Sequence, residues 1–181
     1  METAATGEAR AKVPGTLYAV LAPLTTLGPL SLDMYLPGLP AMTRELHASE
    51  SVSQLTLTTC FIGLALGQVL AGPLSDAVGR RRPLEVGLAA YAAASLLCAL
   101  APTMEALVAL RFLQGLAGGS AAVIAMAVVR DRYTGIAAAR LFSLLMLVTM
   151  LSPMLAPAFG GQLLRFTSWH GIFVALAMVG L

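Results

Sequence analysis

Apolar stretches of about 20 residues alternate along this chain with short clusters of charged residues. An α-helix needs about 20 apolar residues to cross a hydrocarbon core that is about 30 Å thick. Only helices and closed barrels satisfy their backbone hydrogen bonds in that environment. The stretches lack the alternation of apolar and polar positions that is typical of barrel strands. The pattern therefore predicts an all-α membrane protein.

Six helices are expected, and five of them are long enough to span a membrane. The five lie at residues 16–36, 53–74, 84–101, 104–129 and 138–164. A sixth begins near His170 and reaches the last residue, Leu181, so at 1.5 Å per residue it is only about 18 Å long. We therefore expect a bundle of six helices at residues 16–181, with its sixth helix truncated, preceded by a tail at residues 1–15.

Basic residues are distributed unevenly between the two predicted sides of the membrane. One side carries eight of them, whereas the other carries only Arg44 and Arg165. Because loops rich in Lys and Arg stay in the cytoplasm, this asymmetry predicts a multi-pass protein of the plasma membrane with a cytoplasmic N-terminus. The eight residues are Arg10, Lys12, Arg80, Arg81, Arg82, Arg130, Arg132 and Arg140.

Composition agrees with this interpretation and argues against several classes of function. Hydrophobic residues make up 58% of the chain and charged residues 11%, whereas soluble domains have about 25% charged residues. The arginines are explained as topological anchors, so the net charge of +2 requires no nucleic-acid partner. Cys60 and Cys98 fall within predicted helices, and the two histidines are scattered, so we expect no disulfide and no metal site. The sequence has no catalytic or phosphate-binding motif, which argues against an enzyme.

The stretch GPLSDAVGRRRPLEV, residues 72–86, places several charges between the second and third predicted helices. Its pattern resembles the signature of the major facilitator superfamily at the same loop. That resemblance implies a cytoplasmic gate, in which an aspartate and basic residues contact a helix of the second half of the transporter. Ala77 departs from the family pattern, which usually has a basic residue there, and simple turn chemistry is the alternative interpretation. The gating residues would be Gly72, Asp76, Gly79, Arg80 and Arg81.

Three further segments resemble signatures of the same family, in the same order. LDMYLPGLP, residues 32–40, resembles the first-helix signature of drug:proton antiporters, and RFLQGLAGG, residues 111–119, resembles the fourth-helix signature. SPMLAPAFGG, residues 152–161, resembles the antiporter motif of the fifth helix, although two of its glycines are replaced. The combination of DMYLP, ALGQ, VVRDRY, MLAP and SWH resembles the bicyclomycin and chloramphenicol resistance branch. The residues of the antiporter motif are Ser152, Pro153, Ala156, Pro157, Gly160 and Gly161.

Asp33, Arg111 and Gln114 are the candidate residues for proton coupling or substrate binding. A charge within a spanning helix is costly, so it usually faces a cavity or a partner. Asp33 and Arg111 are expected at comparable depth, where they would share one central cavity and interact directly or through water. Asp33 could instead be an interfacial acid at a helix end, and Arg111 could be a hub for hydrogen bonds to backbone carbonyls. Gln114 could equally bond a neighbouring helix.

Other positions have a mainly structural interpretation. Gly63 and Gly67 are four residues apart, as are Gly115 and Gly119, and small residues at this spacing let helices approach closely. Gln68 is expected either to line a pathway or to contact another helix. A stripe of methionines is expected to face lipid or to pack, rather than to bind drugs: Met146, Met150 and Met154.

The resemblance implies a proton-coupled exporter of small lipophilic drugs, driven by the proton gradient and without a cofactor. The chain would be the N-terminal half of this transporter in the inner membrane, and its partners would be the bilayer, the drug, protons and a C-terminal half of six helices. Two alternatives stay open. The chain is a fragment that does not transport, or it is a small transporter that builds its pathway from two copies. The sequence does not identify the drug.

Overall fold

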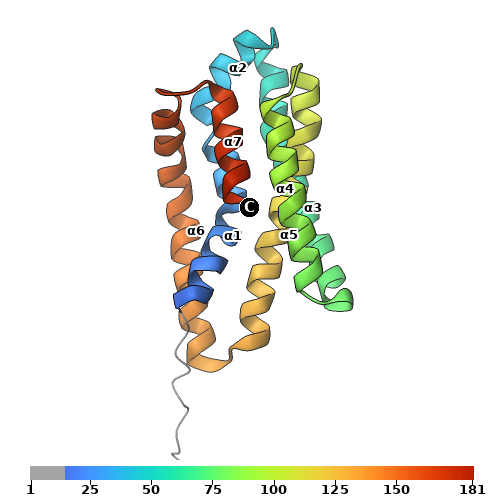
Figure 1. The fold of residues 1–181 in the computed structure, drawn as a ribbon, viewed down its shortest axis with the longest axis vertical. Helices are drawn as coiled ribbons and strands as arrows, with labels where there is room; N and C mark the ends of the chain where they lie inside the picture. Colours follow the sequence, from blue (N-terminus) through green and yellow to red (C-terminus); the bar gives the residue numbers. More distant parts are fainter. Residues whose placement is uncertain (1–14) are drawn as a thin grey trace, which may run out of the picture.

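Seven α-helices and one short 3-10 helix form an elongated bundle in the computed structural model, which describes residues 15–181 (Figure 1). The predicted tail, with Arg10 and Lys12, lies outside the described residues except for Gly15. The elements are α1 (Gly15–Asp33), the 3-10 helix η1 (Leu36–Gly38), α2 (Leu39–Glu45), α3 (Glu50–Val78), α4 (Arg81–Ala99), α5 (Met104–Arg132), α6 (Gly135–Leu163) and α7 (Trp169–Val179). The prediction of an all-α fold is confirmed for the described part of the chain.

Four helical segments within the described residues are long and apolar enough to cross a membrane. They are Leu17–Glu45, Glu50–Val78, Met104–Arg132 and Gly135–Leu163. The 19 residues of α4 are less apolar, because Arg81, Arg82 and Glu85 occupy the start of this helix. The shorter α7 has 11 residues and runs along only part of the bundle (Figure 1).

Local sequence explains where the helices begin and end. The hydroxyl of Ser49 accepts a hydrogen bond of 3.4 Å from the Val52 amide, and Thr103 caps α5 in the same way. At the end of α3, Gly79 adopts a φ of 87°, a conformation that favours glycine. The bounds of the long helices differ from the predicted ones by up to four residues, and two of these differences concern the first and second helices. The first helix ends at Asp33 rather than at residue 36, and the second continues to Val78, four residues past its predicted end at residue 74.

Glycines bring α3 and α5 into close contact, as their spacing predicted. A Cβ atom at Gly63 would collide with the carbonyl of Phe112, and one at Gly115 would collide with the carbonyl of Cys60. Gly67 and Gly119 face backbone atoms of the opposite helix in the same way. The two helices therefore pack backbone against backbone, and α5 becomes the central element on which α1 and α4 also pack.

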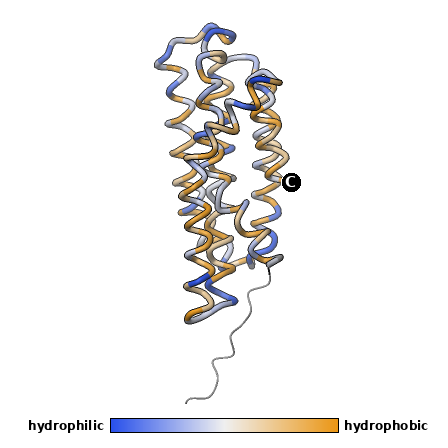
Figure 2. Tube along the Cα trace, turned by 90° about the vertical axis from the view of Figure 1, so that its left-hand side faces the viewer, coloured by the Kyte–Doolittle hydropathy of each residue, from blue (hydrophilic) through white to orange (hydrophobic). Residues whose placement is uncertain are grey.

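In Figure 2 most of the trace is coloured hydrophobic along the length of the bundle, and most of the strongly hydrophilic segments lie near its ends. Val69 of α3 and Met150 of α6 are each 68% exposed, which suits helices surrounded by lipid. The connections between α3 and α4 and between α5 and α6 lie at the same end of the bundle (Figure 1). We call this the basic end, because it carries Arg80, Arg81, Arg82, Arg130, Arg132 and Arg140.

Candidate transport site

Arg111 is fully buried at the centre of the bundle, where α5 passes α1 and α4. One terminal nitrogen of its guanidinium donates a hydrogen bond of 2.6 Å to the side-chain carbonyl of Gln114. The other donates a bond of 2.6 Å to the backbone carbonyl of Ser31 in α1. Arg111 thus joins two helices through a planar group that donates in fixed directions.

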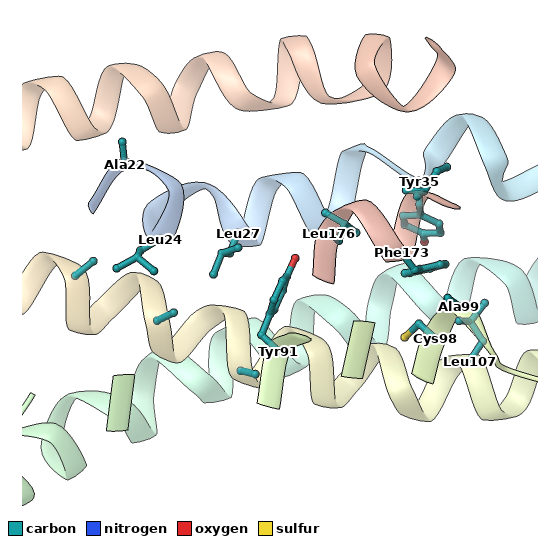
Figure 3. Close-up of a cluster of buried hydrophobic side chains, with 14 of the residues drawn as sticks. Ala22, Leu24, Leu27, Tyr35, Tyr91, Cys98, Ala99, Leu107, Phe173 and Leu176 are labelled. Carbon is teal, nitrogen blue, oxygen red and sulfur yellow. The ribbon is translucent and has the colours of Figure 1, made fainter. Parts of the chain in front are cut away.

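Gln114 and two hydroxyl groups extend this network to α4. The Gln114 amide donates to the Ser95 hydroxyl over 2.7 Å, and Ser95 donates to the carbonyl of Tyr91 over 2.8 Å. The Tyr91 hydroxyl, which points toward α1 in Figure 3, lies 2.7 Å from the hydroxyl of Ser31. Gln114 therefore bonds a neighbouring helix, which was one of the two interpretations of its sequence position.

Aromatic rings cover the remaining faces of the Arg111 guanidinium. Its central carbon lies 4.2 Å from the ring centroid of Tyr35 and 5.7 Å from that of Phe173 in α7. The Tyr35 hydroxyl is 2.9 Å from the hydroxyl of Thr56 in α3, so this cluster reaches that helix as well. Ring faces attract a cation, and within the described residues no carboxylate pairs with Arg111. The Nε atom of Arg111 is buried without a hydrogen-bond partner.

Asp33 is not brought to Arg111 by the structure. It is the last residue of α1 and partly buried, and its carboxylate makes no ion pair or hydrogen bond with the described part of the chain. Ser31, whose carbonyl meets Arg111, is two residues earlier, and two residues turn a helix by about 200°. The expected direct interaction is therefore absent from these described residues, and Arg111 is a hydrogen-bond hub instead.

A hollow of about 520 Å³ lies between α1, α3, α5 and α6, and we call it the half-cavity. Within the described residues, no charged side chain lines it. The amide of Gln68 reaches it from α3 and makes no side-chain hydrogen bond with any described residue, so it is available to a ligand. Asp33 lies one helical turn beyond Pro29, which lines the hollow. The lining includes Thr25, Pro29, Leu32, Phe61, Gln68, Met126, Met146 and Thr149.

Two prolines leave backbone acceptors beside this half-cavity. Pro29 stands four residues after Thr25, and Pro153 stands four residues after Thr149. Because proline has no N–H, the helical hydrogen bond to each threonine carbonyl cannot form. Both threonine hydroxyls donate within their own helices, over 2.9 Å, to Ala22 and Leu145. The half-cavity thus combines an apolar wall, a free amide and two backbone carbonyls that lack their usual donors.

The antiporter motif supports the contact between α6 and α1. Ser152, Ala156 and Gly160 form one buried stripe of small residues, and a Cβ at Gly160 would collide with the Met34 carbonyl. Replacing two glycines by serine and alanine therefore preserves close packing. Three other residues of the motif are not buried, namely Pro153, Pro157 and Gly161.

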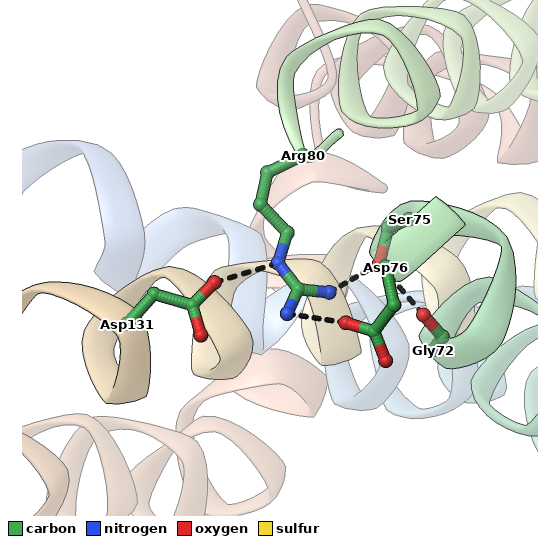
Figure 4. A network of polar contacts seen from close by, with 5 residues as sticks. All are labelled: Gly72, Ser75, Asp76, Arg80 and Asp131. Carbon is green, nitrogen blue, oxygen red and sulfur yellow. Dashed lines mark hydrogen bonds and ion pairs between the residues drawn. The ribbon is translucent and has the colours of Figure 1, made fainter. Parts of the chain in front are cut away.

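At the basic end, Arg80 connects the ends of α3 and α5 (Figure 4). Its guanidinium pairs with Asp76 over 2.5 Å and with Asp131 over 2.8 Å, and it donates to the Ser75 hydroxyl over 2.6 Å. The hydrogen bond from Arg80 to Asp131 is the largest cause of the raised pKa of Arg80. Ser75 in turn donates to the carbonyl of Gly72 over 3.0 Å.

Two of the predicted gating residues do not lie in a turn. Gly72 and Asp76 belong to α3, which continues to Val78, because hydropathy falls before the helix itself ends. Gly79 does form the turn, and Arg81 pairs with Glu85 over 2.7 Å on an exposed surface. Asp76 is 57% exposed, so its carboxylate is also accessible from outside this half of the bundle.

Comparison with known proteins identifies the family. Residues 21–181 match the model of the Major Facilitator Superfamily. The chain belongs to this superfamily. It is 48% identical over 166 residues to the "Uncharacterized MFS-type transporter YdgK" of Bacillus subtilis, which covers 91% of this chain and 41% of the relative.

Two further relatives of this major facilitator chain carry resistance names. The "Bicyclomycin resistance protein homolog" of Haemophilus influenzae is 35% identical over 158 residues, covering 87% of the chain and 40% of the relative. The "Multidrug resistance protein MdtL" of Escherichia coli is 37% identical with the same coverage, 87% and 40%. The chain thus spans about two fifths of the length of these relatives.

Asp131 is the functional candidate that the sequence interpretation missed in this superfamily member. Its contact with Arg80 joins positions that are 51 residues apart, so no local spacing indicates it. A signal was nevertheless present. Asp131 is an acid placed between Arg130 and Arg132, at an end of the bundle that is otherwise basic.

Proposed function

We propose that this chain forms the first half of a proton-coupled exporter of small lipophilic drugs in the inner membrane. A second six-helix half would complete the pathway, as in a transporter built from two bundles around a site near the midplane. The half-cavity carries the proposal. It is apolar, it is lined by four helices, and its few polar groups are uncharged.

The lining indicates which molecules would bind. An uncharged wall accepts lipophilic compounds without the desolvation of an opposing charge. The Gln68 amide both donates and accepts hydrogen bonds, and the carbonyls of Thr25 and Thr149 accept them. We therefore expect ligands that combine an apolar body with at least one hydrogen-bond donor. The resistance names of two relatives support this class of substrate.

Asp33 is the proposed proton carrier, since it lies at the rim of the half-cavity and is free of a partner among the described residues. Arg111 has a different role in this proposal. It holds α1 through the carbonyl of Ser31, two residues before Asp33, and holds α4 through Gln114 and Ser95. A movement of α1 on protonation of Asp33 would therefore be transmitted to α4 and α5.

The proposal is tested with the complete transporter, that is, this chain joined to its second half. Gln68→Leu keeps the size of the side chain and removes its hydrogen bonds, so we expect drug efflux from loaded vesicles to fall about five- to tenfold. Gln54→Leu, at an exposed position of the same helix, is the matched control and should transport normally. Equal efflux by Gln68→Leu and the unmodified protein would contradict the assignment of the half-cavity.

The chain by itself is expected not to transport, because the half-cavity is bounded by only one bundle. Expression of residues 1–181 alone should give no increase in drug resistance, and co-expression with a matching second half should restore it. Drug-coupled proton flux in liposomes that contain this polypeptide alone would favour a pathway built from two copies.

A further inference from the structure

A second groove, apart from the half-cavity, lies between α3, α4 and α5 and has a volume of about 500 Å³. Its walls include Leu70, Leu74, Val86 and Leu113. Among the described residues that line it, Ser120 carries the only polar side chain, and that hydroxyl donates to the carbonyls of Leu116 and Ala117 within α5. The groove therefore offers no free polar group and suits a hydrocarbon chain.

Small residues on α4 create this groove and give it length. Gly87, Ala90 and Ala93 leave space between α4 and α3, which make few contacts with each other. The groove extends along α4 from Pro83 to Leu97, a rise of about 21 Å. One leaflet of the hydrocarbon core is about 15 Å thick. A whole acyl chain can therefore lie along the groove.

Arg82 lies at the basic end of the groove, on the same face of α4. It precedes Val86 by four residues and Ala90 by eight, so the three positions form one stripe. Side chains of a helix lean toward its N-terminus, and the N-terminus of α4 is at the basic end. The guanidinium of Arg82 is therefore directed past the groove toward the membrane surface, where long basic side chains place their charge.

Among the described residues, the neighbouring arginines are already paired, whereas Arg82 is not. Arg80 binds Asp76 and Asp131, and Arg81 binds Glu85. Arg82 makes no ion pair and no side-chain hydrogen bond with residues 15–181. The apolar groove, which is as long as an acyl chain, thus ends at a cation that has no partner within the described part of the chain.

We propose that this groove binds one acyl chain of an anionic phospholipid, whose phosphate pairs with Arg82. Burial of the chain removes apolar surface of both partners from water or from looser lipid packing. The phosphate supplies the negative counter-charge that Arg82 does not find among the described residues. The proposal is independent of what the half-cavity transports, because lipid retention is measured without any drug or proton gradient.

Native mass spectrometry of the complete transporter tests the proposal. Phosphatidylglycerol and phosphatidylcholine with identical acyl chains are added at equal ratios to the delipidated protein. We expect one phosphatidylglycerol to be retained about fivefold more tightly than phosphatidylcholine, the preference that one basic residue gives near a membrane surface. Arg82→Gln should abolish this preference, and Ala90→Leu, which fills the groove, should lower the retention of both lipids.

Matched variants separate this site from general lipid binding. Ala89→Leu adds the same side chain at an exposed neighbouring position outside the groove, and Arg81→Gln removes an adjacent charge. Both should retain the fivefold preference. A phosphatidylglycerol with a diazirine in its acyl chain should label peptides that contain residues 67–97, and Ala90→Leu should suppress this label.

Three outcomes would overturn the proposal. Equal loss of preference in Arg81→Gln and Arg82→Gln would indicate diffuse attraction to the basic end. Unchanged retention in Ala90→Leu would show that no acyl chain enters the groove. Labelling confined to other peptides would show that the second half, or another occupant, covers it.

Discussion

Arg111 donates a hydrogen bond of 2.6 Å to the backbone carbonyl of Ser31 and not to a carboxylate. A buried guanidinium is thereby stabilised by a carbonyl dipole, by the amide of Gln114 and by the ring faces of Tyr35 and Phe173. These partners come from α1, α5, α7 and, for Tyr35, the turn between α1 and η1. The Arg111 guanidinium at the centre of the bundle therefore connects helices to one another.

Replacing Arg111 by lysine should destabilise the bundle although the charge is retained. A lysine ammonium is a single point and cannot reach the Ser31 carbonyl and the Gln114 carbonyl in the planar geometry of the guanidinium. The loss of one hydrogen bond to a charged group should cost about 1.5–3 kcal/mol. Thermal unfolding of the purified transporter measures this loss as a lower melting temperature.

Arg44→Lys, an exposed basic residue, is the control for that variant and should melt normally. Transport by Arg111→Lys is then compared at equal amounts of folded protein. An unshifted pH profile is expected for a hub between helices. A shifted profile at unchanged melting temperature would instead make Arg111 a direct modulator of proton binding.

The packing of α3 against α5 should depend on the glycines at their contact, because these residues have only a hydrogen atom as their side chain. In Gly115→Ala the new methyl group would collide with the Cys60 carbonyl, and overpacking of this kind costs about 1–3 kcal/mol. Gly161→Ala introduces the same methyl group where nothing lies within 4 Å, and it should be neutral or slightly stabilising. The difference in melting temperature between the two variants measures the cost of separating the helices. Equal melting temperatures would contradict the backbone contact.

The sequence predicted the positions of the helices along the chain well. It did not predict which side of each helix faces its neighbours. The length of apolar stretches indicated most of the helix positions, and the spacing of Gly63 and Gly67 indicated a close contact. Distance along a helix gave Asp33 and Arg111 similar depths, but depth does not say which way a side chain faces. Among the described residues Arg111 donates to the carbonyl of Ser31 and makes no direct contact with Asp33, so a contact through water stays a prediction.

The basic end shows a second limit of sequence reasoning. The charges of Asp76 and Arg80 were recognised through their resemblance to a family signature, and their spacing of four residues suits a pair on consecutive helical turns. The contact with Asp131 depends on how α3 and α5 cross, which is a tertiary property. Hydropathy also failed to place the end of α3, because Ser75 and Asp76 are polar but still helical.

Arg80 and Asp131 should be energetically coupled at low salt. A double-mutant cycle with Arg80→Gln and Asp131→Asn measures the coupling directly through thermal unfolding. Because Asp131 is 45% exposed, the coupling should shrink as salt is raised from about 0.1 M to about 1 M and the Debye length falls from about 10 Å to about 3 Å. Glu85→Gln, which breaks the more exposed pair with Arg81, should change stability less. Strictly additive effects at low salt would argue against the network.

The basic end of the bundle predicts its orientation in the membrane, with this end in the cytoplasm. Val78→Cys places a thiol at this end without removing an arginine, and it should be shielded from membrane-impermeant reagents in intact cells. Ala48→Cys, at the opposite end, should be labelled. The native thiols of Cys60 and Cys98 are fully buried and should not contribute to the signal. Labelling of Val78→Cys but not of Ala48→Cys would reverse the predicted topology.

Asp33→Asn separates proton coupling from drug binding in the complete transporter. Asparagine keeps the size of the side chain but cannot ionise, so efflux driven by a proton gradient should fall severely. Exchange of labelled drug across the membrane at equal pH needs the half-cavity but no net proton transfer, and it should persist. Glu50→Gln removes an acid from the first turn of α3 and should leave both activities unchanged. Gradient-driven efflux with the pH dependence of the unmodified protein would exclude Asp33 as the proton carrier. Loss of both gradient-driven efflux and drug exchange would instead give Asp33 a structural role at the rim of the half-cavity.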